Sequence, residues 1–305
     1  MPNSETKIYH SDDLDLLQLL KVLNESKKII FMVSGIIFLI STIFCLFLPN
    51  IYRAETVLAP ASYDRDVRMS SVLSQFSGIA SLAGINVGDD RVDKSDLAIE
   101  VLKSRKFVRE FVERHKILPL LMAVDSWDTK TRKIEFNKSL YNPKTKSWNG
   151  DNAIPSAEEV YEKFRESLII IEENNTEFVR VGFYHQSPDI AAKWTSLLIK
   201  DLNNDIRKQD IQEAEGALAY LSGQVDKSKT ADLRDLFYNL IQAQTETMML
   251  ANVREEYVFK TIDPATVPEN KFKPKRVLIT FIATILSVFI MSIIILIRYF
   301  TDSKK

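Results

Sequence analysis

The feature that most constrains this chain is a pair of long apolar runs near its two ends. The second run, residues 277–297, contains 21 residues and no charged side chain. At about 1.5 Å per residue, a helix of this length crosses a hydrocarbon layer of roughly 30 Å. The first run, residues 29–48, contains 20 residues and is equally free of charge. The sequence therefore predicts two membrane-spanning helices with one large loop between them.

The first run differs from a cleaved signal peptide in three respects. It follows an acidic segment, it is about twice as long as the apolar part of such a peptide, and Leu48-Pro49-Asn50-Ile51 offers no cleavage site with small residues. We therefore expect an uncleaved anchor.

Basic residues near the runs bear on orientation. Lysines 21, 27 and 28 precede the first run, which favours a cytoplasmic N-terminus, but lysines 271, 273 and 275 crowd the loop side of the second. Long loops cross membranes largely regardless of their charge. We expect both termini in the cytoplasm and the loop outside it. The predicted regions are a tail (1–28), a span (29–48), a periplasmic domain (49–276) with a helical arm (about 188–256), a span (277–297) and a tail (298–305).

Composition and motifs exclude several function classes. The 40 basic and 41 acidic side chains give a net charge of −1, which argues against a nucleic-acid-binding protein. Cys45 is the sole cysteine and lies in the first run, so neither an intrachain disulfide nor a cysteine zinc site is expected. His10, His115 and His185 show no metal-ligand spacing, and no nucleotide-binding or hydrolase motif occurs. We expect no enzyme activity, cofactor or metal.

Between the runs, the pattern alternates between strands and capped helices. We expect strands at 52–60 and 257–261, the first and last of the loop, to pair. We also expect a helix at 96–115 that is capped by Ser95 and buries Leu97, an irregular excursion or small hairpin at 125–150, a helix begun by the capping box Ser156-Ala-Glu-Glu159, and a hairpin of 168–172 with 177–184.

The longest helical pattern starts at Ser187-Pro188-Asp189, which combines an N-cap, a proline at the first position and an acid in the first turn. Apolar residues recur to residue 225, which corresponds to about 57 Å of helix if it is unbroken. A polar turn at 226–231 precedes a second pattern that ends near residue 253. The expected fold is an α+β membrane protein, in which two transmembrane helices flank an α/β base domain that carries a long antiparallel helical hairpin.

Small residues and prolines are the candidate structural positions. Gly35 in the first run, and Ala283 and Ser287 in the second, would let helices approach closely in lipid, although such residues are common in spans anyway. Pro264, Pro268 and Pro274 prevent a continuous helix before the second run and favour an extended connector.

Two further segments leave alternatives open. Residues 11–28 fit a surface helix that leads into the first span or a contact helix for a neighbour. Residues 69–88 fit a loosely packed helix and loop, or an amphipathic segment against the membrane or another subunit.

Four motifs in this order, together with the two-span layout, resemble the polysaccharide co-polymerases, also called chain length determinant proteins. They are DDLDLLQLLKVL at 12–23, YRAETVLAP at 52–60, SPDIAAKWTSLLIKDLN at 187–203 and PATVPENKFKPKR at 264–276. Each motif alone is weak, and the resemblance covers essentially the whole chain through their order.

The resemblance implies a Gram-negative inner-membrane protein with a periplasmic domain, assembled as a closed homo-oligomer. It would set the modal length of O-antigen or a related surface polysaccharide together with the membrane polymerase, in contact with membrane lipids and the growing lipid-linked glycan. A related branch carries a cytoplasmic tyrosine autokinase domain. Eight residues follow the second run, so kinase activity is not implied. An export adaptor for capsule or exopolysaccharide is the alternative, and a purely structural envelope protein is a weaker one.

Overall fold

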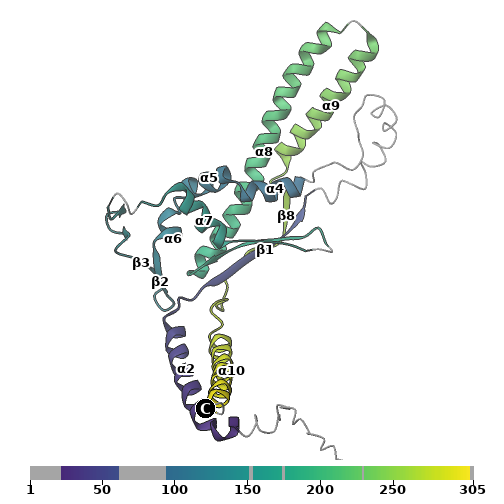
Figure 1. Cartoon of the computed structure of the whole chain (residues 1–305). Helices are drawn as coiled ribbons and strands as arrows, with labels where there is room; N and C mark the ends of the chain where they lie inside the picture. The colour runs from purple at the N-terminus through teal and green to yellow at the C-terminus, as the bar shows by residue number, and fades with distance from the viewer. Residues whose placement is uncertain (1–21, 62–93, 151–153, 174–175, 229, 303–305) are drawn as a thin grey trace, which may run out of the picture. The chain divides into compact units, whose positions relative to one another are not determined.

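The computed structural model describes residues 22–61, 94–150, 154–173, 176–228 and 230–302 (Figure 1). The chain divides into two compact units, one of Met1–Pro49 with Lys273–Lys305 and one of Asn50–Phe272. We call the first the helix pair and the second the loop domain. Most of the predicted leading helix at 11–28, and the whole segment 69–88, lie outside the described residues.

The helix pair consists of α2 (Lys27–Phe47) and α10 (Arg276–Asp302), which pack against each other. Both predicted runs are therefore helical, and α10 continues about one turn past residue 297. The side chains buried in this unit include small polar ones, which allow close packing and bond to their own helix. Ser34 is 4% exposed and donates to the carbonyl of Ile30, and Ser287 is 5% exposed and donates to the carbonyl of Thr284.

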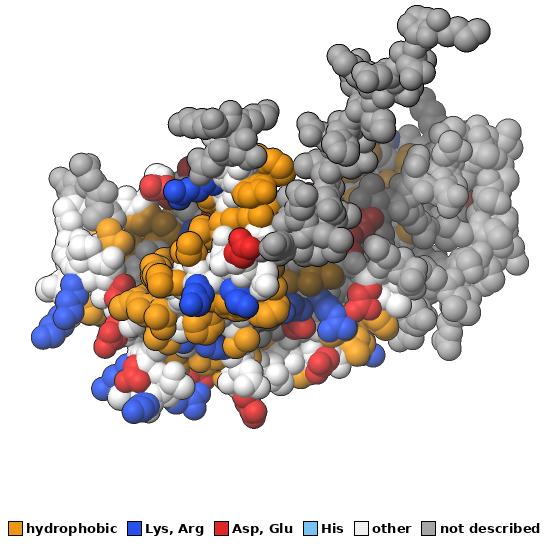
Figure 2. Space-filling model, turned by 60° about the horizontal axis from the view of Figure 1, so that its bottom comes forward, with side chains coloured by type: hydrophobic (Ala, Val, Ile, Leu, Met, Phe, Trp, Pro, Cys, Tyr) orange, Lys and Arg blue, Asp and Glu red, His pale blue; other side chains and the backbone are white. Residues whose placement is uncertain are grey.

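The outer surface of the helix pair is strongly apolar. In the most apolar windows of α2 and α10, only 17% and 6% of the residues are buried. A core helix of a water-soluble protein would be mostly buried, so these helices need an apolar surrounding that the described part of the chain does not supply. Figure 2 shows hydrophobic side chains gathered over this unit. The pair fits a membrane protein with two spans.

A four-stranded antiparallel sheet organises the loop domain. Its order is β6 (Leu168–Glu172), β7 (Val179–His185), β1 (Tyr52–Pro60) and β8 (Phe259–Asp263). The structure confirms the predicted hairpin of β6 with β7 and the pairing of the loop's first and last strands. Strand β8 begins two residues later than predicted. The N–H groups of Val258 and Phe259 both donate to Asn203 Oδ1 (2.8 and 3.0 Å), which fixes where pairing begins.

Helix α8 (Pro188–Lys227) lies across β1 and β7, with α5 (Arg105–His115) and α7 (Ala157–Ser167) beside it. Aromatic side chains fill the layer between helices and sheet. The centroid of the Phe183 ring lies 5.6 Å from that of Trp194 and 5.2 Å from that of Phe164. Both pairs have the edge-to-face arrangement that aromatic rings prefer. A compact core thus joins elements from distant parts of the chain.

Strand β7 approaches β1 closely at Gly182. A Cβ at Gly182 would lie 2.1 Å from the carbonyl oxygen of Ala54, so no other residue fits there without a backbone shift. The same carbonyl accepts a hydrogen bond from Thr195 of α8 at 3.3 Å. Small residues on β1 and α8 therefore set the spacing of helix and sheet.

The predicted single helix at 96–115 is wrong. The chain forms α4 (Lys94–Lys103) and α5, separated by Ser104 in an extended conformation. The Ser104 hydroxyl accepts a hydrogen bond from the N–H of Phe107 and caps α5, so a local side-chain bond overrides the helical pattern. Ser95 lies inside α4 and is buried, while Leu97, expected in the core, is 49% exposed.

The excursion at 125–150 contains two small hairpins. After the short α6 (Leu118–Met122), β2 (Val124–Asp128) pairs with β3 (Lys133–Phe136), and β4 (Tyr141–Asn142) pairs with β5 (Ser147–Trp148). The Trp148 ring packs on Tyr141 at 5.3 Å. Helix α7 then begins with the predicted capping box of Ser156 and Glu159.

The predicted helical hairpin is confirmed. Helix α8 runs unbroken for 40 residues, about 60 Å, from the predicted start, where Ser187 accepts from the N–H of Ile190. Helix α9 (Ala231–Val253) returns antiparallel against the second half of α8. We call residues 207–253 the arm, and the remainder of the loop domain the base.

Candidate functional site: the helical arm and its root

The arm has almost no core of its own. Among its described residues, only Ala214 and Ala251 are buried. Two helices meet along a single line, so each keeps most of its surface in solvent. Large apolar side chains nevertheless stand exposed on the arm: Tyr220, Leu233, Leu236, Tyr238, Leu240, Met249 and Val253. Where such side chains share one face of a helix, the surface is typical of an interaction site.

Helix α9 carries two apolar stripes. The inner stripe faces α8 and contains Phe237, Ile241 and Met248, which are partly buried, together with Ala251. The outer stripe contains Leu233, Leu236 and Leu240, which are 47%, 50% and 43% exposed. Its spacing of three and four residues places these leucines on one face of the helix. The sequence pattern merges both stripes, and only the structure shows that the outer one is about half exposed in the described part of the chain.

The root of the arm is fixed to the sheet by a buried asparagine. Asn203 on α8 is 4% exposed. Besides accepting the two N–H groups at the start of β8, its Nδ2 donates to the carbonyl of Phe259 at 3.0 Å. About two turns further along α8, Asp210 accepts a hydrogen bond from the Tyr257 hydroxyl at 2.6 Å and pairs with Lys94. Sequence reasoning missed Asn203, because an asparagine within a helical pattern gives no signal of a distant backbone partner.

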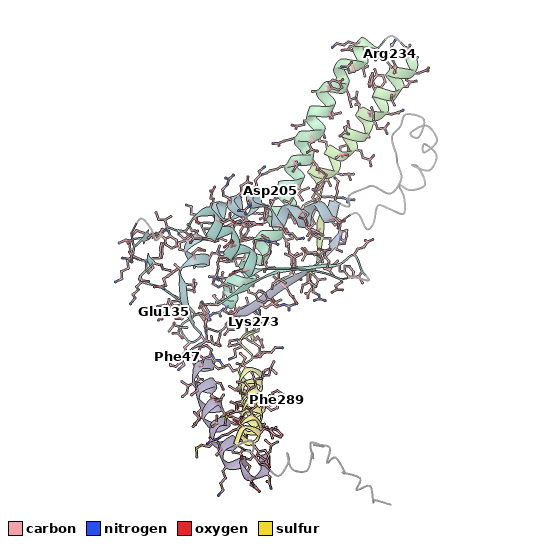
Figure 3. All side chains as sticks on the ribbon, viewed as in Figure 1. Phe47, Glu135, Asp205, Arg234, Lys273 and Phe289 are labelled. Atoms are coloured by element: carbon pink, nitrogen blue, oxygen red, sulfur yellow. The ribbon has the colours of Figure 1, made fainter. Side chains whose placement is uncertain are left out.

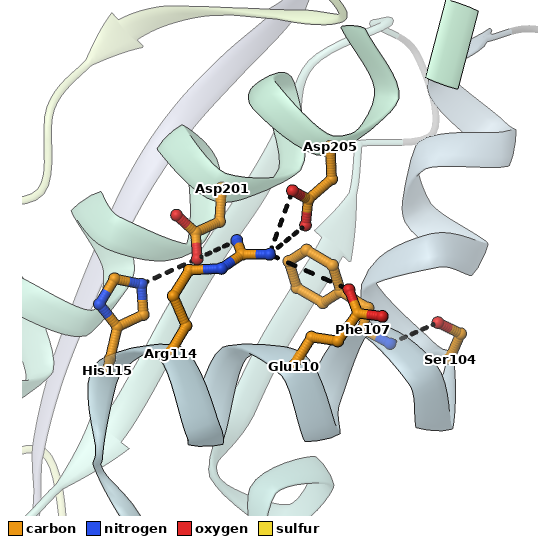
Figure 4. Close-up of polar contacts among 7 residues, drawn as sticks. All are labelled: Ser104, Phe107, Glu110, Arg114, His115, Asp201 and Asp205. Carbon is orange, nitrogen blue, oxygen red and sulfur yellow. Dashed lines mark hydrogen bonds and ion pairs between the residues drawn. The ribbon is translucent and has the colours of Figure 1, made fainter. Parts of the chain in front are cut away.

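A charged cluster joins α5 to the same part of α8 (Figure 4). The Arg114 guanidinium lies 2.7 Å from the Asp201 carboxylate and 3.2 Å from the Asp205 carboxylate. The His115 Nε2 also lies 2.8 Å from Asp201. Burial alone lowers the pKa of Arg114, but hydrogen bonds to Asp205 and Asp201 outweigh it and raise that pKa. Arg114 therefore stays charged and balances Asp201, whose side chain is 9% exposed.

This geometry gives the arm a stiff attachment. Figure 3 shows Asp205 where α8 leaves the base and Arg234 at the far end of the arm. The hydrogen bonds of Asn203 and the ion pairs of Arg114 both act at the root, so the direction of α8 is set by the base. The far part of the arm presents its apolar side chains outward on that rigid support.

His185 has a structural role. His185 is buried, accepts the N–H of Ser187 at Nδ1 (2.9 Å), and donates from Nε2 to the carbonyl of Leu120 (3.0 Å). Burial lowers its pKa, which favours the neutral ring that these two bonds require. Within the described residues, no group of three His, Cys, Asp or Glu side chains could hold a metal ion.

The structure places the predicted structural residues in different surroundings. Gly35 is exposed, with open space where a Cβ would stand, while Ala283 is partly buried and Ser287 is buried. Residues 264–275 contain no helix, and within them Pro264 is exposed while Pro268 and Pro274 are partly buried. Gly35 thus remains open to a neighbouring helix, and Pro264 lies beside a cavity at the arm root.

Comparison with known proteins supports the resemblance. Residues 12–115 match the family model described as "Wzz: Chain length determinant protein". No curated protein matches the chain. Among solved structures, the chain is similar to a "full-length bacterial polysaccharide co-polymerase", at 12% identity over 95% of this chain and 99% of that chain, with a TM-score of 0.38. The family assignment rests on the sequence match. The family prediction is therefore supported over residues 12–115, which match the model of the chain length determinant proteins.

Proposed function

We propose that this chain is a non-catalytic regulator of the modal length of O-antigen or a related surface polysaccharide. It acts as a closed homo-oligomeric scaffold beside the membrane polymerase. The helix pair spans the inner membrane of a Gram-negative bacterium, both termini are cytoplasmic, and the loop domain is periplasmic. The family match supports the polysaccharide role, and the apolar surface of the helix pair supports the membrane location.

The outer stripe of α9 is the observation that supports assembly of this chain into a scaffold. Burying a fully exposed leucine side chain contributes about 1.5–3 kcal/mol, and these three leucines are 43–50% exposed, so covering all three at every subunit contact favours assembly by a share of that value each. A stiff arm holds this stripe in a fixed direction, which suits a symmetric ring. The open face at Gly35 offers a second packing site, where the spans of neighbouring subunits approach in lipid. Pro264, Pro268 and Pro274 keep the connector extended, and Ala283 and Ser287 pack the two helices.

The size distribution of surface polysaccharide, measured by gel, tests this function. The gene is deleted and then restored as the unchanged chain or as L236Q/L240Q. We expect deletion to replace the modal band by a random ladder, the unchanged chain to restore the band, and the variant to fail. A variant at Tyr238, Y238Q, should restore the band, because Tyr238 lies on the opposite side of α9 from the stripe.

The deletion also separates the alternatives. Loss of surface polymer with accumulation inside the cell would show an export adaptor and contradict length control. An unchanged profile, with no second gene of this kind present, would contradict both.

A further inference from the structure

A cavity of about 530 Å³ lies at the root of the arm, within the loop domain. Its walls come from β1, from one face of α8, from the segment after α9, and from the residues that follow β8. This volume lies in the range of sites that hold small ligands. Most of the lining residues have polar side chains, and Ile199, Pro264 and Ala265 are the apolar ones.

Arg207 is the distinctive group in this cavity. Its side chain is partly buried, and its guanidinium donates to Asn204 Oδ1 at 2.8 Å and to the carbonyl of Arg254 at 3.4 Å. Both acceptors are uncharged, and the guanidinium has five N–H donors. Among the residues that the structure describes, no carboxylate forms an ion pair with Arg207, in contrast to Arg114 on the other side of α8. An anion from outside the chain is the best partner for a partly buried cation of this kind.

The other lining groups indicate which further chemical groups the anionic ligand has. Lys200 stands exposed at the rim and adds a second cation. Glu255 and Glu256 lie on another wall, where their carboxylates accept hydrogen bonds and repel a second anionic group in the same cavity. The Glu256 carboxylate already accepts the N–H of Thr261 at 2.9 Å and is held in place by it. The cavity therefore presents cations on one side and acceptors for hydroxyl groups on the other.

We infer that this cavity binds an acidic sugar residue of a polysaccharide, with the sugar carboxylate on Arg207 and Lys200 and its hydroxyl groups donating to Glu255 and Glu256. Arginine suits this role because its planar donors match the two oxygens of a carboxylate. The inference rests on the proposed function for its choice of a glycan. It adds a contact at the arm root through which an assembled scaffold would hold the polymer.

Direct binding to the purified full chain in detergent tests the site. Trigalacturonic acid serves as the acidic probe and maltotriose as the neutral one, and titration calorimetry measures both. We expect the unchanged chain to bind trigalacturonic acid and to bind maltotriose at least about tenfold more weakly. Arg207→Gln and Lys200→Gln should each weaken binding of the acidic probe about tenfold. Arg234→Gln, at the far end of the arm, should leave it unchanged (Figure 3).

The exposed position of Lys200 keeps the test valid if Arg207→Gln unfolds the root. Three results would overturn the site: no binding of trigalacturonic acid, equal binding of maltotriose, or binding that both cavity variants leave intact. Each of these binding results is independent of the gel assay, because a chain can restore the modal band without binding trigalacturonic acid. Conversely, a chain that binds the probe but leaves polymer length unchanged on deletion would retain the site and lose the proposed function.

Discussion

The base and the arm of the loop domain are stabilised in different ways. The base buries a cluster of aromatic and aliphatic side chains between helices and sheet, whereas the described arm residues bury two alanines. The base is thus built as a self-sufficient folding unit. The arm keeps leucines in solvent that only a further surface can cover. The contrast separates a region that is stabilised by its own core from a region that exposes apolar side chains.

The largest expected difference between base and arm comes from removing one aromatic ring from each of them. Phe183→Ala opens a cavity between Phe164 and Trp194 and should lower the free energy of unfolding by about 3–5 kcal/mol. Tyr220→Ala, at a side chain 66% exposed on the arm, should change it by less than about 0.5 kcal/mol. Denaturant titration of the full chain, followed by circular dichroism, measures both. Equal losses would show that the arm has a core that contributes to folding.

The charged cluster at the root tests whether the base also fixes the direction of the arm. Arg114→Met leaves Asp201 with His115 as its remaining partner in this cluster, and should cost about 2 kcal/mol of stability. This is below the cost for a fully buried pair, because the Arg114 side chain is 39% exposed and partly screened. Lys163→Met, which breaks an exposed pair with Glu166, is the control and should cost less than about 0.5 kcal/mol. If both variants unfold at the same denaturant concentration, the cluster does not secure the root.

Asn203→Ala removes the other attachment of the root. The substitution leaves the N–H groups of Val258 and Phe259 without their shared acceptor, and should cost about 1–3 kcal/mol. Hydrogen exchange at residues 258–263 should rise, because β8 loses its fixed start. Asn252→Ala on α9, where the side chain bonds to the carbonyl of Met248 at the surface, provides the comparison. Unchanged exchange in β8 would argue against this role of Asn203.

The smallest expected effect is the pH dependence that His185 gives to the base. Burial lowers the pKa of His185 in the folded chain from its ordinary value of 6.5, so the unfolded chain binds more protons between the two pKa values. This contribution to stability is therefore complete above pH 6.5 and is lost as the pH falls through the folded pKa. Unfolding midpoints of the unchanged chain and His185→Asn, compared from pH 8 to pH 5, isolate it. A difference that stays constant over this range would contradict the assignment.

Local signals predict most elements of this fold from the sequence. The capping box at Ser156, the helix start at Ser187 and the two apolar runs each act within one or two turns, and the structure confirms all of them. The first and last strands of the loop could also be paired in advance, because both show strand patterns at its two ends. Such features depend on neighbours in the sequence and are visible there.

Two kinds of feature are not visible in the sequence: a cap inside a continuous apolar pattern, and a bond to a distant partner. Ser104 caps α5 through the N–H of Phe107, three residues away, but the apolar pattern continues on both sides of it and predicts an unbroken helix. Asn203 bonds to a backbone 55 and 56 residues away. The leucines of α9 formed one pattern in the sequence, and the position of α8 alone divides them into an inner and an outer stripe. The candidate assembly surface therefore required the structure.

The mass of the assembly tests the central claim most directly. Purified full chain, L236Q/L240Q and the control Y238Q are compared by mass photometry in the same mild detergent, with circular dichroism as a check on folding. We expect the unchanged chain and Y238Q to form one closed oligomer, and L236Q/L240Q to dissociate toward monomers while keeping its helix content. An L236Q/L240Q variant that assembles to the same mass as the unchanged chain would contradict assembly through the arm.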